Sequence, residues 1–258
     1  MSGGSLEAVV GLDVGTSAVK ALAVGLDGDV LASHEVAYPL SMPHPGWAEQ
    51  DPEDWWRATE EALAAVSGSA EVLGVGLSGQ MHGLVALDSA DRVIRPAILW
   101  NDQRTAVECE EIAARIGERE LIALTGNRAL TGFTAPKLLW MRGHEPEAYA
   151  QIARVVLPKD YVRLRLCGEH ATDVADASGT LLLDVAGRSW SGDLLEALEI
   201  EREWLPRLLE SPQPSGTTSD GVTVAAGAGD QAAGALGVGV VRPGPLSVVL
   251  GTSGVVLV

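Results

Sequence analysis

Two short turns of nearly the same sequence stand at opposite ends of the chain. GTSAV occupies residues 15–19, and GTSGV occupies residues 251–255. In each case an apolar run precedes the glycine and apolar residues follow it, which is the pattern of a tight turn between two strands. Successive N–H groups in such a turn, with the Thr16 and Ser17 hydroxyls beside them, can bind a phosphate.

A carboxylate comes just before the first of these turns. Asp13 lies near the end of the apolar run VVGLDVG, so its side chain would stand beside a phosphate bound at Gly15, Thr16 and Ser17. A carboxylate in that place can hold Mg²⁺, usually through water. Because Asp, Gly, Thr and Ser are also frequent in ordinary turns, the first turn taken alone leaves both interpretations open.

Two further groups of polar residues follow apolar segments. GAGDQAAGALG, residues 227–237, places Asp230 after a glycine-rich turn and at the start of a helix, whose N-terminus keeps a carboxylate ionised. SGQMHG, residues 78–83, places Met81 and His82 between glycines at the end of a strand. Both groups could line a ligand site. A plain helix cap at Asp230 and a structural histidine at His82 are the alternatives.

Other patterns exclude several kinds of site. GVGLSG, residues 74–79, matches G-x-G-x-x-G, but QMHGLVALD after it has a strand pattern where a dinucleotide site needs a helix. No lysine follows a glycine, so there is no Walker A loop. The five histidines lack metal-site spacing, and Cys109 and Cys167 form no C-x-x-C pair, so we expect reduced thiols.

Composition narrows the function classes. Of 258 residues, 47% are hydrophobic, and the formal net charge is −17. Such a charge repels phosphate backbones and anionic lipids, so nucleic acid and membrane are not expected partners. The first residues, MSGGSLEAVV, do not form a signal peptide, and no apolar run reaches 18 residues. We therefore expect a cytoplasmic protein.

The elements that must position these residues begin with three strands. Residues 8–37 alternate apolar runs with turns, which predicts an antiparallel meander. Asp51 then has the pattern of a helix N-cap followed by Pro52 and two acidic residues. On this helix, Trp56, Leu63 and Val66 are predicted to share one face with Thr59.

The rest of the chain alternates strands and helices. Strands are predicted at 71–79 and 82–88, a helix at 105–116, and a mixture of helices and loops over 120–210. Residues 222–240 have the pattern of strand, glycine turn and helix, and 245–258 that of strand, turn and strand. This order, with strands apolar on both faces, predicts an α/β fold around a buried mixed sheet.

Taken together, the motifs resemble the N-terminal half of the FGGY family of carbohydrate kinases, and within it the xylulokinases. They are DVGTS, SGQMHG, RPAILWNDQR, TGFTAPKLLW, LPKDYVRLRL, GAGDQAAGALGVG and LGTSG, in this order from about Val9 to Val258. The resemblance implies a ribonuclease H-like domain of the actin-like ATPase fold, with a mixed sheet flanked by helices. It implies a sugar-binding domain over residues 1–245 and the first hairpin of a truncated ATP-binding domain over 246–258.

The resemblance also implies an activity and a set of site residues. The activity is phosphorylation of the 5-hydroxyl of D-xylulose by ATP with Mg²⁺. Asp230 matches the catalytic base, Asp13 matches the acid near Mg²⁺, bound through water, and Met81 and His82 match the sugar-binding pair. The further positions are Gln231 and Trp100 for the sugar, Gly15, Thr16 and Ser17 for the first phosphate loop, and Gly251 and Thr252 for the second.

Several alternatives stay open at this point. One is a kinase for another sugar, such as gluconate, ribulose or glycerol, although Met81 and His82 stand where a glycerol kinase is expected to have Arg and Glu. A second is a sugar-binding fragment without catalysis, and a third is a structural actin-like ATPase, against which GQMHG and GAGDQ weigh. A homodimer is also open. Since relatives run on for about as long again, we expect this chain alone to be inactive.

Overall fold

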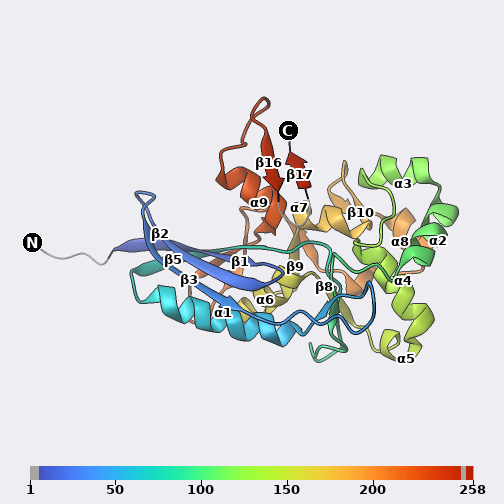
Figure 1. Cartoon of the computed structure of the whole chain (residues 1–258), viewed down its shortest axis with the longest axis horizontal. Coiled ribbons are helices and arrows are strands. Elements are labelled where there is room, and N and C mark those ends of the chain that lie inside the picture. The colour runs from blue at the N-terminus through green and yellow to red at the C-terminus, as the bar shows by residue number, and fades with distance from the viewer. Residues whose placement is uncertain (1–5, 251–253, 258) are drawn as a thin grey trace, which may run out of the picture.

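The computed structural model describes residues 6–250 and 254–257, as a mixed sheet beside a lobe of helices (Figure 1). The sheet has the strand order β13–β14–β5–β1–β2–β3, and β15 also pairs with β5. Its strands are β1 (Glu7–Val14), β2 (Ala18–Gly25), β3 (Val30–Ala37), β5 (Glu71–Gly79), β13 (Pro214–Thr217), β14 (Thr223–Ala225) and β15 (Ala228–Gly229).

The pairing directions in this sheet agree with the predicted topology. β1 pairs with β2 and β2 pairs with β3, both antiparallel, so the predicted meander is confirmed. β5 runs parallel to β1, and β14 and β15 run parallel to β5. The carboxyl ends of β1, β5 and β15 therefore meet at one edge of the sheet.

Helix α1 (Pro52–Ser67) begins as predicted, because the Asp51 side chain accepts a hydrogen bond from the Glu53 amide at 3.0 Å. Thr59 and Val66 are buried as predicted, and Trp56 and Leu63 are half-buried against the same core. The centre of the buried face is Trp55, which is fully buried and was not predicted. Trp55 packs under the sheet and donates its indole N–H to Gln50 at 3.0 Å. This extra polar contact between helix and strand could not be read from apolar spacing.

The sheet is buried on one face only, so the prediction of burial on both faces is wrong. Side chains of β1 alternate between exposed and buried along the whole strand. Val9 on β1 and Leu73 on β5 are 44% and 43% exposed. The reason is that α1 and α6 (Pro158–Cys167) both lie along the same side of the sheet (Figure 1).

A second hydrophobic core lies in the helical lobe, apart from the core between the sheet and α1. The predicted helix at 105–116 is confirmed as α2, and the mixture of helices and loops over 120–210 is confirmed. The further helices are α2 (Ala106–Ile116), α3 (Glu118–Thr125), α4 (Thr134–His144), α5 (Pro146–Tyr149), α7 (Val174–Ala177), α8 (Gly192–Leu198) and α9 (Asp230–Gly237), with 3-10 turns η1 (Ser178–Thr180) and η2 (Arg202–Trp204).

Short strand pairs lie outside the main sheet. The strand predicted at 82–88 is shorter, as β6, and no helix follows Gly79, which agrees with rejecting a dinucleotide site. The short strands are β4 (Glu49–Gln50), β6 (Val85–Leu87), β7 (Ala97–Ile98), β8 (Arg154–Val156), β9 (Ala171–Asp173), β10 (Leu183–Asp184), β11 (Ser189–Trp190) and β12 (Arg207–Leu209).

Two strands, β16 (Ser247–Leu250) and β17 (Gly254–Leu257), lie where the two strands of the last segment were predicted. Within residues 6–250 and 254–257, these two strands pair only with each other. Gly251 and Thr252 of the predicted second phosphate loop lie outside the described residues. None of the helices described combines the length and apolar character needed to cross a bilayer.

Candidate functional site

The predicted site residues come together at the carboxyl edge of β1, β5 and β15. Asp13 is the register partner of Ser78, and Ser78 is in turn the partner of Ala228. Asp230 follows two residues after Ala228, at the first position of α9. Asp13 and Asp230, far apart in sequence, therefore flank the end of β5.

Asp13 is exposed at this edge, and its Oδ1 accepts a hydrogen bond from the Ser78 hydroxyl at 2.6 Å. Burial raises the pKa of Asp230, and the negative charge of Asp13 raises it further, while the Gln231 amide and side chain act in the opposite direction. The helix start was expected to keep Asp230 ionised, yet the net direction of the pKa is upward because burial outweighs the Gln231 contacts. A carboxylate with a raised pKa is a better proton acceptor.

The loop before Asp230 requires glycine at two positions. Gly227 has φ +80°, and a Cβ there would lie 2.1 Å from the carbonyl oxygen of Leu77. At Gly229, a Cβ would lie 2.6 Å from the Cγ of Met81 and 2.9 Å from its Sδ. Met81 therefore packs directly against the residue before Asp230.

The turn at Gly15, Thr16 and Ser17 is closed as predicted, with the Gly15 amide donating to the Ala18 carbonyl at 3.0 Å. The backbone carbonyl groups of the turn accept hydrogen bonds from side chains of neighbouring segments. Gly15 accepts from the Tyr38 hydroxyl and from Gln80 Nε2, and Thr16 accepts from Gln50 Nε2 at 2.7 Å.

The side chains of Gln50 and Gln80 support this turn from the protein interior. Both side chains are buried, and Gln80 Nε2 also donates to Gln50 Oε1 at 3.0 Å. The Thr16 and Ser17 amides donate to no group in the part of the chain that the structure describes. The carbonyls are thus directed inward and two N–H groups stay available for an anion. Neither glutamine was predicted as a site residue, although Gln80 lies inside the SGQMHG motif.

Trp100 contacts the turn itself. Its indole N–H donates to the Thr16 hydroxyl at 3.0 Å, so Trp100 stands beside the predicted phosphate loop. It was predicted to wall the sugar site, and this contact places it at the phosphate loop; its role toward the sugar stays a prediction. Gln231 is half-buried at the start of α9 and contacts Asp230.

His82 has a left-handed backbone, with φ 65°. Its Nδ1 lies 2.8 Å from the Gly179 carbonyl oxygen, and its ring meets Phe133 edge to face at 4.8 Å. Burial lowers the pKa of His82 to about 4, and the positive charge of Lys137 also lowers it. His82 is therefore neutral at pH 7.

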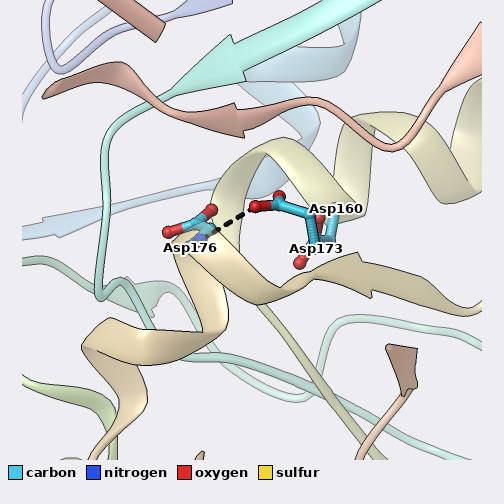
Figure 2. A group of neighbouring side chains, drawn as sticks. All are labelled: Asp160, Asp173 and Asp176. Atoms are coloured by element: carbon cyan, nitrogen blue, oxygen red, sulfur yellow. Dashed lines mark hydrogen bonds between the residues drawn. The ribbon is translucent and has the colours of Figure 1, made fainter. Parts of the chain in front are cut away.

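A buried ionic cluster lies behind the site and was not predicted. It contains Lys159, Asp160, Arg163, Asp173 and Asp176, all with at most 1% exposure. Figure 2 shows the three carboxylates and the hydrogen bond from the Asp176 amide to Asp173, at 2.9 Å. The Arg163 guanidinium also donates to the carbonyl of Ala226, which precedes β15, so the cluster supports the strand that leads to Asp230.

The three carboxylates have the spacing of a cation site, but a lysine already fills it. Lys159 Nζ lies 2.6 Å from Asp160, 2.7 Å from Asp173 and 3.0 Å from Asp176. An ammonium group at these distances occupies the place that a metal ion would need. We therefore regard this cluster as a support for the fold.

Comparison with known proteins adds to this geometry. Residues 8–237 match the FGGY family of carbohydrate kinases, N-terminal domain. The chain is 47% identical over 258 residues to the xylulose kinase of Escherichia coli (strain K12), covering 95% of this chain and 53% of that protein.

Two crystal structures of xylulose kinases agree with the fold. The enzyme from Brucella ovis superposes with a TM-score of 0.92 at 44% identity, over 96% of this chain and 53% of that one. The enzyme from Rhodospirillum rubrum gives a TM-score of 0.93 at 31% identity, over 96% and 54%. The chain spans about half the length of the curated relatives it matches. With its mixed sheet, its glycine-rich edge and this match over most of its length, the chain belongs to the FGGY family of carbohydrate kinases.

Proposed function

We propose that this chain supplies the sugar-binding half of a kinase that transfers a phosphoryl group from ATP to the 5-hydroxyl of D-xylulose. The observation that carries the proposal is the shared edge of β1, β5 and β15, where Asp13, Met81 and Asp230 lie together. The similarity to xylulose kinases supports the choice of sugar.

Asp230 is the proposed base for the sugar hydroxyl. Its pKa is raised by burial and by Asp13, which strengthens its affinity for the hydroxyl proton. Phosphoryl transfer needs mainly positioning and charge neutralisation, so a carboxylate that orients the hydroxyl and takes its proton late is sufficient. Met81 and His82 would hold the sugar beside this carboxylate.

The first turn is the proposed contact for the phosphates of ATP. This turn begins two residues after Asp13, at the end of β1, and carries the Thr16 and Ser17 amides and hydroxyls. The exposed carboxylate of Asp13 is the kind of oxygen ligand that suits Mg²⁺, here through water. Bound there, Mg²⁺ would neutralise phosphate charge in a protein that is otherwise acidic.

The domain boundary stays part of the proposal. Residues 1–245 would form the sugar-binding domain, and 246–258 would begin the ATP-binding one. The pairing of β16 and β17 only with each other, within the described residues, supports this division. The homodimer and the cytoplasmic location stay predictions.

The test uses the purified 258-residue chain, with a full-length relative as control. We expect calorimetry to detect D-xylulose binding and a coupled ADP-release assay to find turnover far below the control. The full-length relative with Asp230→Asn introduced at the matching position should bind the sugar and lose turnover. If the wild-type chain is folded and binds no D-xylulose, the proposed sugar is wrong. Turnover within about tenfold of the control would refute the need for a second domain, because that is a barrier difference of only about 1.4 kcal/mol.

A further inference from the structure

We propose that Lys137 is a positioning residue for sugar recognition, which holds His82 so that its imidazole presents Nε2 as a hydrogen-bond acceptor to a hydroxyl of a neutral sugar. The inference rests on the proposed function and adds to it a residue from α4 that the sequence analysis did not select.

The backbone of His82 needs support from outside. Its φ of 65° is a left-handed conformation that costs a non-glycine residue about 1 kcal/mol. The first turn of α4 provides the support, because two side chains there donate to the His82 carbonyl oxygen. Lys137 Nζ lies 2.9 Å from that oxygen and Thr134 Oγ1 lies 3.1 Å from it.

Lys137 is an unusual group for packing alone. Its side chain is fully buried, and its Nζ bonds to the carbonyls of His82 and Gly132, the latter at 2.6 Å. No carboxylate forms an ion pair with it in the part of the chain that the structure describes. Burial lowers the pKa of Lys137 to about 7, although the negative charge of Asp102 acts in the opposite direction, because a charged amine is unfavourable away from water. An apolar side chain of similar length would pack without that cost, so the amine acts through the two carbonyls that it holds.

The imidazole of His82 is fixed as firmly as its backbone. A carbonyl oxygen can only accept, so the contact from Nδ1 to Gly179, at 2.8 Å, requires the proton on Nδ1. Gly179 permits this approach, because a Cβ there would lie 2.1 Å from Nδ1. In a neutral imidazole with its proton on Nδ1, Nε2 carries a lone pair.

Nε2 is the atom left for a ligand. No hydrogen bond to it is formed by the residues that the structure describes. A lone pair accepts from the O–H of a sugar, whereas a carboxylate offers only lone pairs in return. The arrangement therefore favours a hydroxyl over a carboxylate at this position.

The experiment compares three variants of the chain. Lys137→Met keeps the stem and removes the amine, and Thr134→Val removes the second donor to the same carbonyl. Lys20→Met is the matched control, because Lys20 is exposed on β2. Calorimetry gives the dissociation constant for D-xylulose and for gluconate, and long-range ¹H–¹⁵N NMR of the imidazoles gives the tautomer of His82, assigned with His82→Asn.

We expect the wild type and Lys20→Met to show an Nδ1-protonated His82 and to bind D-xylulose more tightly than gluconate. Lys137→Met should weaken D-xylulose binding at least tenfold and change the His82 spectrum, and Thr134→Val should do the same to a smaller extent. If Lys137→Met does not fold, the proposal is tested with Thr134→Val alone.

The proposal is overturned if a folded Lys137→Met, or in its absence Thr134→Val, binds D-xylulose like the wild type with an unchanged His82 signal. It is also overturned if His82 of the wild type carries its proton on Nε2. Should the folded wild type bind no D-xylulose, the proposed function fails, and the NMR comparison still judges the role of Lys137.

Discussion

The buried cluster behind the site predicts opposite outcomes for two substitutions of the same kind. Asp160 lies 2.6 Å from Lys159 and 2.7 Å from Arg163, whereas Asp176 contacts Lys159 alone among the described cations, at 3.0 Å. We expect Asp160→Asn to destabilise the protein and Asp176→Asn to be tolerated. Both changes are isosteric, so the difference isolates charge.

The reason lies in which carboxyl holds a proton. Burial raises the pKa of Asp176 to about 7, more than the attraction of Lys159 lowers it. Burial alone would also raise the pKa of Asp160, but Lys159 and Arg163 outweigh it and lower the value. With Asp176 protonated, two carboxylates face two cations and the cluster is neutral.

The magnitude for Asp176 follows from its shift. Its pKa rises from 3.8 to about 7, so the folded state keeps a proton that the unfolded chain has released between these values. The free energy of unfolding therefore falls as pH rises through that window and is level above it. A rise of about three pKa units corresponds to a loss of about 4 kcal/mol in the free energy of unfolding, and about 3 kcal/mol of this loss occurs between pH 5 and pH 8. Asp176→Asn carries no such proton and should gain on the wild type by up to that amount over this range.

Asp160→Asn is not expected to raise the free energy of unfolding. It leaves Arg163 buried without the carboxylate it pairs with, and breaking a buried pair typically costs about 3 kcal/mol or more. Urea denaturation followed by circular dichroism at pH 5, 6.5 and 8 measures all three proteins. The reasoning is refuted if Asp176→Asn is as destabilising as Asp160→Asn at pH 8, or if its difference from the wild type does not change with pH.

Two further predictions concern the loops of the site. Gly227→Ala should destabilise the protein by about 3 kcal/mol more than Gly28→Ala. Both glycines have positive φ, but only at Gly227 would the added Cβ lie within 4 Å of a backbone oxygen. Equal melting temperatures of the two variants would contradict this prediction. Gln80→Leu should cost about 2 kcal/mol, because it removes two buried hydrogen bonds of about 1 kcal/mol each, to the Gly15 carbonyl and to Gln50 Oε1. The exposed Gln151→Leu should cost little, and chemical denaturation measures the difference.

Local features of the fold could be predicted because they depend on neighbours in sequence. The meander and the cap of α1 follow from residues a few positions apart, and so does the glycine turn before Asp230. The repeated GTS turn located Thr16 correctly at a tight turn. The similar motifs also gave the family, although the second turn at Thr252 lies outside the described residues.

Contacts between distant segments could not be predicted in the same way. The bond between His82 and Gly179 joins residues 97 positions apart, and no pattern near either residue signals it. Lys137 and Lys159 stood in apolar runs, where a buried lysine is far less common than an exposed one. The open face of β1 was missed because Val9 and Gly11 look like interior residues, while the position of α1 and α6 alone decides which face is covered.

The position of β5 between β1 and β15 has a consequence for how the protein is made. During synthesis the meander and β5 can pair once the first eighty or so residues have emerged, because β5 ends at Gly79. β15 joins the same strand only after the whole helical lobe has been translated, and closing so long a segment is slow. Asp230 therefore reaches this edge of the sheet after Asp13 has already been placed there by the pairing of β1 with β5. Until it arrives, the nascent chain exposes an unpaired strand edge on β5, which is the part of the folding chain most open to wrong pairing.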